Sequence, residues 1–231
     1  MTTSAPGPLA LLGGGEFSPA CATLDRELLG AVGADEVLVL ATAAAFEGVD
    51  AVIERAVAYF DGLGVSATGL AVLHRRDTDD PVLLERVRHA RALFITDGSP
   101  LHLRSVLKDS ALYAAIVDAY EKGAALIASG AGATLLGDPM VDPRGGAYTV
   151  GLGLVPGLAV FPYHGTTAEH LRARSVDLLP HNAVLAGVDT ETALVLRDGA
   201  WSVAGTGAVV IYRRGAKPKK VTAGQPVDLR V

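Results

Sequence analysis

The chain has 231 residues, of which half are hydrophobic and 19% are charged, and its formal net charge is −5. The apolar content is enough for one sizeable core, which predicts a single domain over residues 1–231. The acidic balance excludes a broad phosphate-binding surface, so we expect no nucleic-acid partner. No apolar stretch reaches the ~20 residues of a membrane span, and the N-terminus does not resemble a secretory signal, so we expect no membrane contact and a cytoplasmic location. The single cysteine, Cys21, excludes an internal disulfide and a multi-cysteine metal site, and we expect neither a metal nor a cofactor.

Short apolar runs alternate with amphipathic stretches in the first 136 residues. The apolar runs predict five buried strands, at 8–12, 36–41, 67–73, 92–96 and 124–128. The stretches between and after them predict helices, at 24–32, 49–63, 79–90, 100–122 (in one or two pieces) and 131–136. Strands that alternate with helices are typical of a parallel sheet covered on both faces.

The second part of the chain has a different pattern. Residues 148–160 are β-rich but interrupted by glycines, and 166–177 has helical character. Short strands are predicted at 183–188, 193–197, 201–204 and 208–212, with a hairpin turn at Asp198-Gly199. The basic run at 213–220 is interpreted as a solvated loop. The fold class is therefore α/β, a doubly wound and mostly parallel sheet with antiparallel C-terminal hairpins.

The most informative loop follows the fifth predicted strand, because ligands of open α/β sheets bind at the carboxyl ends of the strands. Residues 128–133 read Ala-Ser-Gly-Ala-Gly-Ala. Such small residues are what a nucleophile elbow requires, since its strained turn presents one side chain beside a helix N-terminus. The alternative is a plain strand-to-helix connection. Glycine-rich turns of this kind are common, and the local sequence by itself favours the plain connection.

Five segments in register resemble the motifs of one family. They are 11–16 (Leu-Leu-Gly-Gly-Gly-Glu), 94–101 (Phe-Ile-Thr-Asp-Gly-Ser-Pro-Leu), 128–133, 151–157 (Gly-Leu-Gly-Leu-Val-Pro-Gly) and 187–194 (Gly-Val-Asp-Thr-Glu-Thr-Ala-Leu). Together they resemble the cyanophycinase and alpha-aspartyl dipeptidase (dipeptidase E) family of serine peptidases. The resemblance implies a flavodoxin-like fold of the class I glutamine amidotransferase type and a homodimer. It also implies a cleft and oxyanion region at Gly14, Gly15, Glu16, Asp97, Gly98, Ser99 and Ala131.

The chain departs from this family where the chemistry should lie. The resemblance places the nucleophilic serine at Gly130, the catalytic histidine at Tyr163 and the acid at Thr190. Asp97 stands in place of a glycine of the family's oxyanion segment. Because a catalytic triad works as a unit, losing all three members removes acylation chemistry. The first hypothesis is therefore a degenerate homologue that keeps the cleft and binds a small peptide-like or amino-acid ligand.

Each missing group has a possible replacement one residue away. A shifted set of Ser129, His164 and Glu191 would make the chain an active serine-type peptidase or amide hydrolase acting on aspartyl or peptide-like bonds. Adjacent side chains of a strand point to opposite faces, which disfavours this second hypothesis. The ordinary alternatives are that Ser129 bonds to backbone at a strand end, His164 helps to cap a helix and Glu191 is exposed. A third hypothesis is a structural or assembly subunit.

The triple glycine at 13–15 also invites a nucleotide-binding interpretation. The segment lacks the Gly-x-Gly-x-x-Gly order, and Glu16 would repel a pyrophosphate. No Walker-type Gly-Lys-Ser or Gly-Lys-Thr occurs in the chain. A nucleotide-dependent oxidoreductase is therefore not expected.

Overall fold

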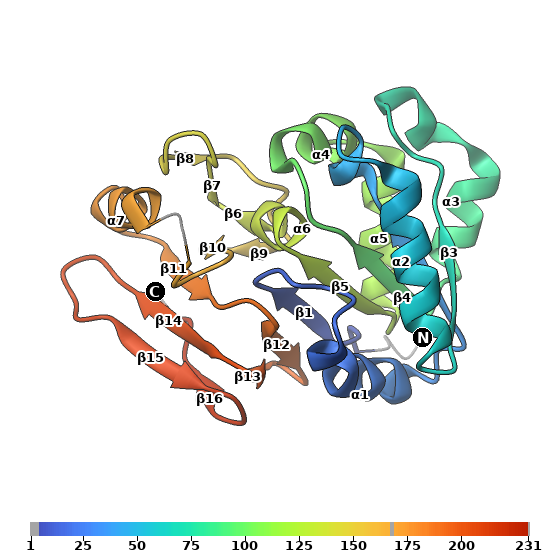
Figure 1. The fold of residues 1–231 in the computed structure, drawn as a ribbon. Helices are drawn as coiled ribbons and strands as arrows, with labels where there is room; N and C mark the ends of the chain where they lie inside the picture. Colours follow the sequence, from blue (N-terminus) through green and yellow to red (C-terminus); the bar gives the residue numbers. More distant parts are fainter. Residues whose placement is uncertain (1–4, 167–168, 231) are drawn as a thin grey trace.

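A computed structural model describes residues 5–166 and 169–230. Its centre is an eight-stranded sheet in the order β16-β13-β12-β1-β5-β4-β2-β3 (Figure 1). In that order the strands are Pro226–Val227, Ala200–Gly205, Thr192–Arg197, Leu9–Leu12, Ala125–Ser129, Ala92–Ile95, Glu36–Leu40 and Ser66–Gly69. The five strands from β1 to β3 in this order pair in parallel, whereas β12, β13 and β16 add antiparallel pairs at one edge.

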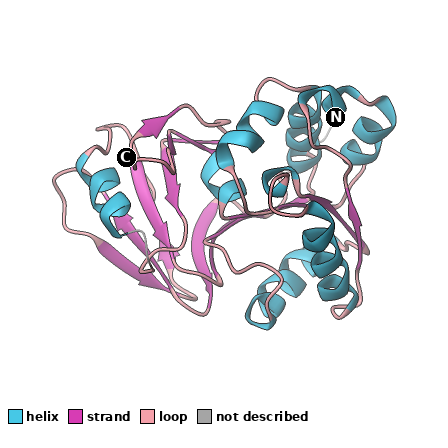
Figure 2. Cartoon of the chain, turned by 45° about the horizontal axis from the view of Figure 1, so that its top comes forward, coloured by secondary structure: helices cyan, strands magenta, loops and turns pink. Residues whose placement is uncertain are grey.

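Helices cover both faces of the parallel part, as Figure 2 shows. Alternate strand residues point to opposite faces, so Leu9 and Leu11 of β1 belong to one buried cluster, and Ala10 and Leu12 to the other. Helices α1 and α2 cover the second face, and α3 to α6 cover the first. The α-helices are α1 Ala22–Val32, α2 Val49–Asp61, α3 Pro81–Arg88, α4 Pro100–Leu107, α5 Ala111–Glu121, α6 Ala131–Leu136 and α7 Glu169–Asp177. Short 3-10 helices lie at Pro19–Cys21, Thr42–Ala44 and Arg75–Asp79.

A second, four-stranded sheet lies beside the first, in the order β10-β11-β14-β15. Its strands are Leu158–Phe161, Val184–Val188, Ala208–Tyr212 and Lys219–Thr222. One face of this sheet contributes to the main core, and the other packs with α7 residues such as Leu171 and Val176. Two small pairs complete the chain, β6 (Gly137–Asp138) with β9 (Val155–Pro156) and β7 (Met140–Val141) with β8 (Tyr148–Thr149).

The predicted fold class is confirmed, and the differences lie at the edges. The strand predicted at 67–73 ends at Gly69. The N–H of Leu70 still donates to the carbonyl of Val39 in the neighbouring strand, but the chain then turns, and the N–H of Val72 donates to the carbonyl of Leu70 (2.9 Å). The basic run is not wholly a loop, since Lys219 and Lys220 begin β15, an edge strand in which only Val221 is buried. The helix predicted over 166–177 is observed from Glu169 to Asp177, and residues 167–168 lie outside the described residues. Among the helices that the structure describes, none combines the length and apolar character that a membrane crossing requires.

Candidate functional site

Gly130 occupies the sharp turn between β5 and α6. Its dihedrals are φ 49° and ψ −106°, and its N–H donates to the carbonyl of Leu12 in β1 (3.0 Å). Thr134 donates its hydroxyl back to the Gly130 carbonyl (3.0 Å), which closes the first turn of α6. A strained strand-to-helix turn with positive φ is the backbone of a nucleophile elbow. Gly130 therefore lies where an elbow presents its reactive side chain, and it has none.

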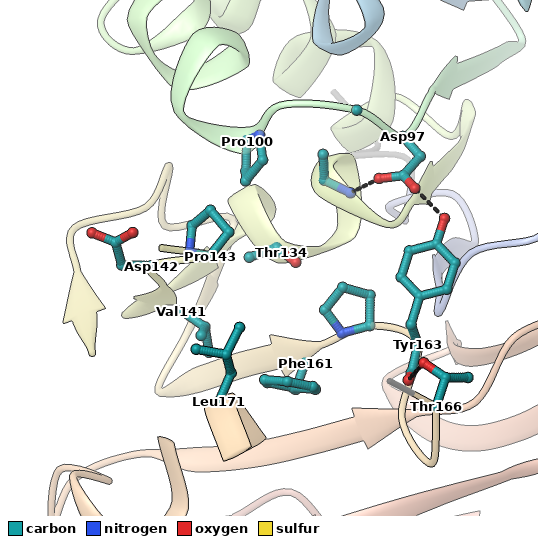
Figure 3. A pocket seen from close by; sticks show the side chains of 13 residues that line it. Asp97, Pro100, Thr134, Val141, Asp142, Pro143, Phe161, Tyr163, Thr166 and Leu171 are labelled. Atoms are coloured by element: carbon teal, nitrogen blue, oxygen red, sulfur yellow. Dashed lines mark hydrogen bonds between the residues drawn. The ribbon is translucent and has the colours of Figure 1, made fainter. Parts of the chain in front are cut away.

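The carboxylate of Asp97 fills the space beside Gly130. An ideal Cβ built on Gly130 would lie 2.1 Å from Asp97 Oδ1, so a side chain at position 130 would require the carboxylate to leave its present place. Oδ1 accepts the N–H of Ala131 (2.7 Å), and Oδ2 accepts the hydroxyl of Tyr163 (Figure 3). The N–H of the residue after the nucleophile is a donor that an elbow offers to an oxyanion. In this chain the protein's own carboxylate already takes that donor.

Tyr163 supports the carboxylate from the opposite side. Its backbone has φ 52°, and its N–H donates a hydrogen bond to the Gly13 carbonyl (2.8 Å). Its ring lies against Gly14, where an added Cβ would come within 2.4 Å of the ring carbons. Burial raises the pKa of the Tyr163 hydroxyl well above its usual range, and the bond to Asp97 and nearby negative charges raise it further. The phenol is therefore a hydrogen-bond donor to Asp97 and not a base.

Ser129 is fully buried and bonded to a carboxylate. Its hydroxyl donates to Glu16 Oε2 (2.7 Å), and its exposed fraction is 0%. The other oxygen of Glu16 accepts the N–H of Asp97 (3.1 Å). Glu16 therefore ties the loop after β1 to the loop after β4. The ordinary interpretation, in which Ser129 bonds to backbone, is therefore wrong: its partner is the side chain of Glu16.

His164 points into a separate network. Its Nδ1 lies 3.1 Å from Asp189 Oδ1, and its Nε2 lies 2.8 Å from the Tyr212 hydroxyl. The ring packs on Gly187, where an added Cβ would be 2.3 Å from the ring carbon Cδ2. No hydrogen bond in the described part of the chain joins Ser129 to His164. Residues Asp189 and Tyr212 were not singled out from the sequence, because only the fold brings them to the histidine.

The two candidates for the acid of a triad, Thr190 and Glu191, lie between β11 and β12. Glu191 is half-buried and not exposed, and its N–H donates to the Gly14 carbonyl (2.8 Å). Its side chain lies against Gly15, whose added Cβ would be 3.0 Å from Glu191 Cγ. Thr190 accepts the hydroxyl of Thr192 at its carbonyl (3.1 Å). Neither Thr190 nor Glu191 bonds to His164, so the structure does not assemble the shifted set.

The residues after Asp97 have structural roles. Gly98 has φ 135° and approaches Ala43 so closely that an added Cβ would lie 2.3 Å from its carbonyl oxygen. Ser99 is the N-cap of α4 and accepts the N–H of His102 (3.3 Å). Both residues hold the loop that carries Asp97.

A cavity of about 330 Å³ lies beside the Gly130 turn (Figure 3). Its walls come from the loop after β4, from α6, from β7 and the turn that follows it, from the end of β10 and from α7. They are Asp97, Gly98, Pro100, Ala131, Thr134, Val141, Asp142, Pro143, Phe161, Pro162, Tyr163, Thr166 and Leu171. Most of these lining residues could not be predicted from the sequence, because they are spread over more than seventy positions, from Asp97 to Leu171. Within the described residues, no cluster of three or more His, Cys, Asp or Glu side chains is placed to hold a metal ion.

Cys21 is expected to resist alkylation. It is 1% exposed, and burial raises the pKa of its thiol from 9.0 to about 11. Only the thiolate reacts, so near pH 8 the folded protein should react with iodoacetamide at least about 100-fold more slowly than the protein unfolded in urea. Mass spectrometry of timed samples measures both rates. Equal rates in the two states would contradict the buried placement.

The comparisons with known proteins agree with this fold. The structure resembles the crystal structure of a peptidase from an acI-B1 Actinobacterium, with a TM-score of 0.88, 29% identity and 98% of each chain covered. It shares its fold with a putative peptidase E protein from Listeria monocytogenes EGD-e, with a TM-score of 0.67, 16% identity, and 88% of this chain and 100% of the other covered. A search of curated proteins finds no match. The sequence model of peptidase family S51 matches residues 9–204, and the chain therefore belongs to peptidase family S51.

Proposed function

We propose that this member of peptidase family S51 binds a small peptide-like or amino-acid ligand in the cavity beside Gly130 and does not carry out serine-type hydrolysis. The observation that carries the proposal is the position of Asp97. Its carboxylate takes both the space of a side chain at 130 and the N–H of Ala131. A cavity of about 330 Å³ remains open next to it.

Amide hydrolysis by a serine peptidase needs a nucleophile, a base that takes its proton and donors that stabilise an oxyanion. Gly130 supplies no nucleophile. Tyr163 has a raised pKa, keeps its proton and donates a hydrogen bond to Asp97, so it cannot act as the base. A negative carboxylate beside the Ala131 N–H would also repel the negative charge of a tetrahedral intermediate. All three requirements fail together.

The shifted set gains no support from the geometry. Ser129 has a carboxylate partner in Glu16, but its exposed fraction of 0% leaves no path for a substrate carbonyl. His164 uses both ring nitrogens in contacts with Asp189 and Tyr212. A purely structural role is also less well supported, since a cavity lies directly beside the turn.

The test is labelling with a fluorophosphonate, which reacts with activated serines. We expect no covalent adduct on the intact protein and no cleavage of aspartyl dipeptides. An active serine peptidase labelled in parallel controls for the reagent. A stoichiometric adduct that disappears in Ser129→Ala would overturn the proposal in favour of the shifted set.

A further inference from the structure

The charged side chains that line the cavity are both acidic. They are Asp97 and Asp142, and no Lys, Arg or His belongs to the described lining. The remaining walls are mainly apolar, with hydroxyls from Thr134, Tyr163 and Thr166. A ligand carboxylate would enter such a cavity without a cation to pair with, at a high desolvation cost.

The two acids are not equivalent. Asp142 accepts the guanidinium of Arg144 through Nε (3.0 Å) and Nη2 (2.6 Å), and this contact lowers the pKa of the Asp142 carboxyl. The hydrogen bonds of Asp97 come from neutral donors, the Ala131 N–H and the Tyr163 hydroxyl. In the described part of the chain, Asp97 has no ion pair. Its charge is therefore uncompensated.

Asp97 also retains acceptor capacity. A carboxylate offers about four lone-pair sites, and one bond to each oxygen leaves one site on each. The Tyr163 hydroxyl donates its O–H to Asp97, and its oxygen still has lone pairs that can accept a hydrogen bond. An ammonium group donates up to three hydrogen bonds, which suits these acceptors.

Further negative charge lies near the same end of the cavity. The charges of Glu16 and Glu47, together with that of Asp97, are among the causes of the raised pKa of Tyr163. Figure 3 shows Asp97 and Tyr163 together at one side, with the apolar side chains of Val141, Phe161 and Leu171 below the open space. The cavity is therefore negative at one end and apolar along its floor.

We infer that the cavity takes a small primary ammonium ligand with an apolar body and no carboxylate. The ammonium binds the free acceptor sites of Asp97, and the apolar body packs on Phe161, Val141 and Leu171. This ligand class rests on the proposed function and narrows it. A peptide-like amine fits with its amino end toward Asp97, whereas a free amino acid is excluded by its carboxylate.

Isothermal titration calorimetry of the full chain with three probes tests the ligand class. The probes are L-leucinamide (cationic), N-acetyl-L-leucinamide (neutral) and N-acetyl-L-leucine (anionic), at about pH 6.5, which is below the pKa of about 7.8 of an α-amino group. A charge-assisted hydrogen bond should make leucinamide bind about tenfold or more tightly than its neutral analogue. The anionic probe should bind most weakly.

The variant Asp97→Asn tests whether the ammonium group of the ligand contacts the Asp97 carboxylate. The amide keeps the size of the carboxylate, and its oxygen still accepts the Ala131 N–H. Its NH2 group then faces the Tyr163 oxygen and donates to it, so the charge is lost and the direction of this one hydrogen bond is reversed. Leucinamide should then bind no better than N-acetyl-L-leucinamide. Asp118→Asn, a change at a partly exposed position on α5 outside the cavity lining, is the matched control and should keep the preference.

The outcomes separate this inference from the function on which it rests. Tightest binding of the anionic probe, or an unchanged preference in Asp97→Asn, would overturn the ammonium site and leave a ligand-binding protein. Failure of all three probes to bind would count against both the ammonium site and the ligand-binding function. If Asp97→Asn does not fold, the ranking of the three probes on the unaltered protein still decides.

Discussion

Replacing Gly130 by serine should lower the free energy of unfolding by about 2–4 kcal/mol and should not create a peptidase. The new Cβ would lie 2.1 Å from Asp97 Oδ1, so the Asp97 side chain must leave its hydrogen bonds with Ala131 and Tyr163, or the turn must move. Overpacking of this kind costs roughly 1–3 kcal/mol, and a positive φ adds strain of about 1 kcal/mol or more for a residue with a side chain. Urea unfolding, followed by circular dichroism, measures the loss.

A double-mutant cycle with Asp97→Ala isolates the clash. In that background the carboxylate is gone, so Gly130→Ser should be less destabilising by about 1 kcal/mol or more. Gly64→Ser is the matched control, because Gly64 has φ 78° and nothing within 4 Å of an added Cβ. It should show the backbone strain alone, on the order of 1 kcal/mol. Additive effects in the cycle, or hydrolysis of an aspartyl dipeptide by Gly130→Ser, would show that the turn is assigned wrongly.

The stability contributed by Asp25 should decrease as the pH rises from about 4 to about 6. Asp25 is 3% exposed in the first turn of α1 and accepts the Tyr59 hydroxyl (2.6 Å). Burial raises its pKa from 3.8 to about 6, although the hydrogen bond from Tyr59 acts in the opposite direction. Between these two values the folded state holds a proton that the unfolded state has released. Linkage then makes the folded state less stable with rising pH, by on the order of 2–3 kcal/mol across the window.

The variant Asp25→Asn removes this titration while its amide oxygen still accepts the Tyr59 hydroxyl. Relative to the unaltered protein, it should gain on the order of 2–3 kcal/mol near pH 7 and little near pH 3.5. Asp61→Asn, an exposed change on α2, should give a difference that stays within about 0.5 kcal/mol at every pH. Urea unfolding at five pH values gives these differences. A gain for Asp25→Asn that shrinks as the pH rises would contradict the raised pKa.

The fold could be predicted where hydrophobic periodicity is strong. Strand β1 is buried at every position and is followed by glycines, which is typical of a strand inside a parallel sheet. The edge strands β15 and β16 gave no such signal. Lys219 and Lys220 are exposed, and β16 has only two residues, so their pairing depends on neighbours that the local sequence does not contain.

The site could be predicted only in part, for a similar reason. The small residues at 128–133 located the turn, and strand alternation explains why Ser129 does not share the direction of its neighbour. The contact of Asp97 with Ala131 joins residues 34 positions apart, and its contact with Tyr163 joins residues 66 positions apart. The sequence marked Asp97 as a departure from a family pattern, but only packing reveals that it fills the gap left by Gly130.

The contact between Asp97 and Gly130 couples these two positions in any redesign of the turn. A serine at position 130 needs the room that the Asp97 carboxylate now occupies. An engineered serine elbow would therefore displace this carboxylate and break its hydrogen bonds with Ala131 and Tyr163. Rebuilding the elbow thus calls for coordinated changes at positions 97 and 130.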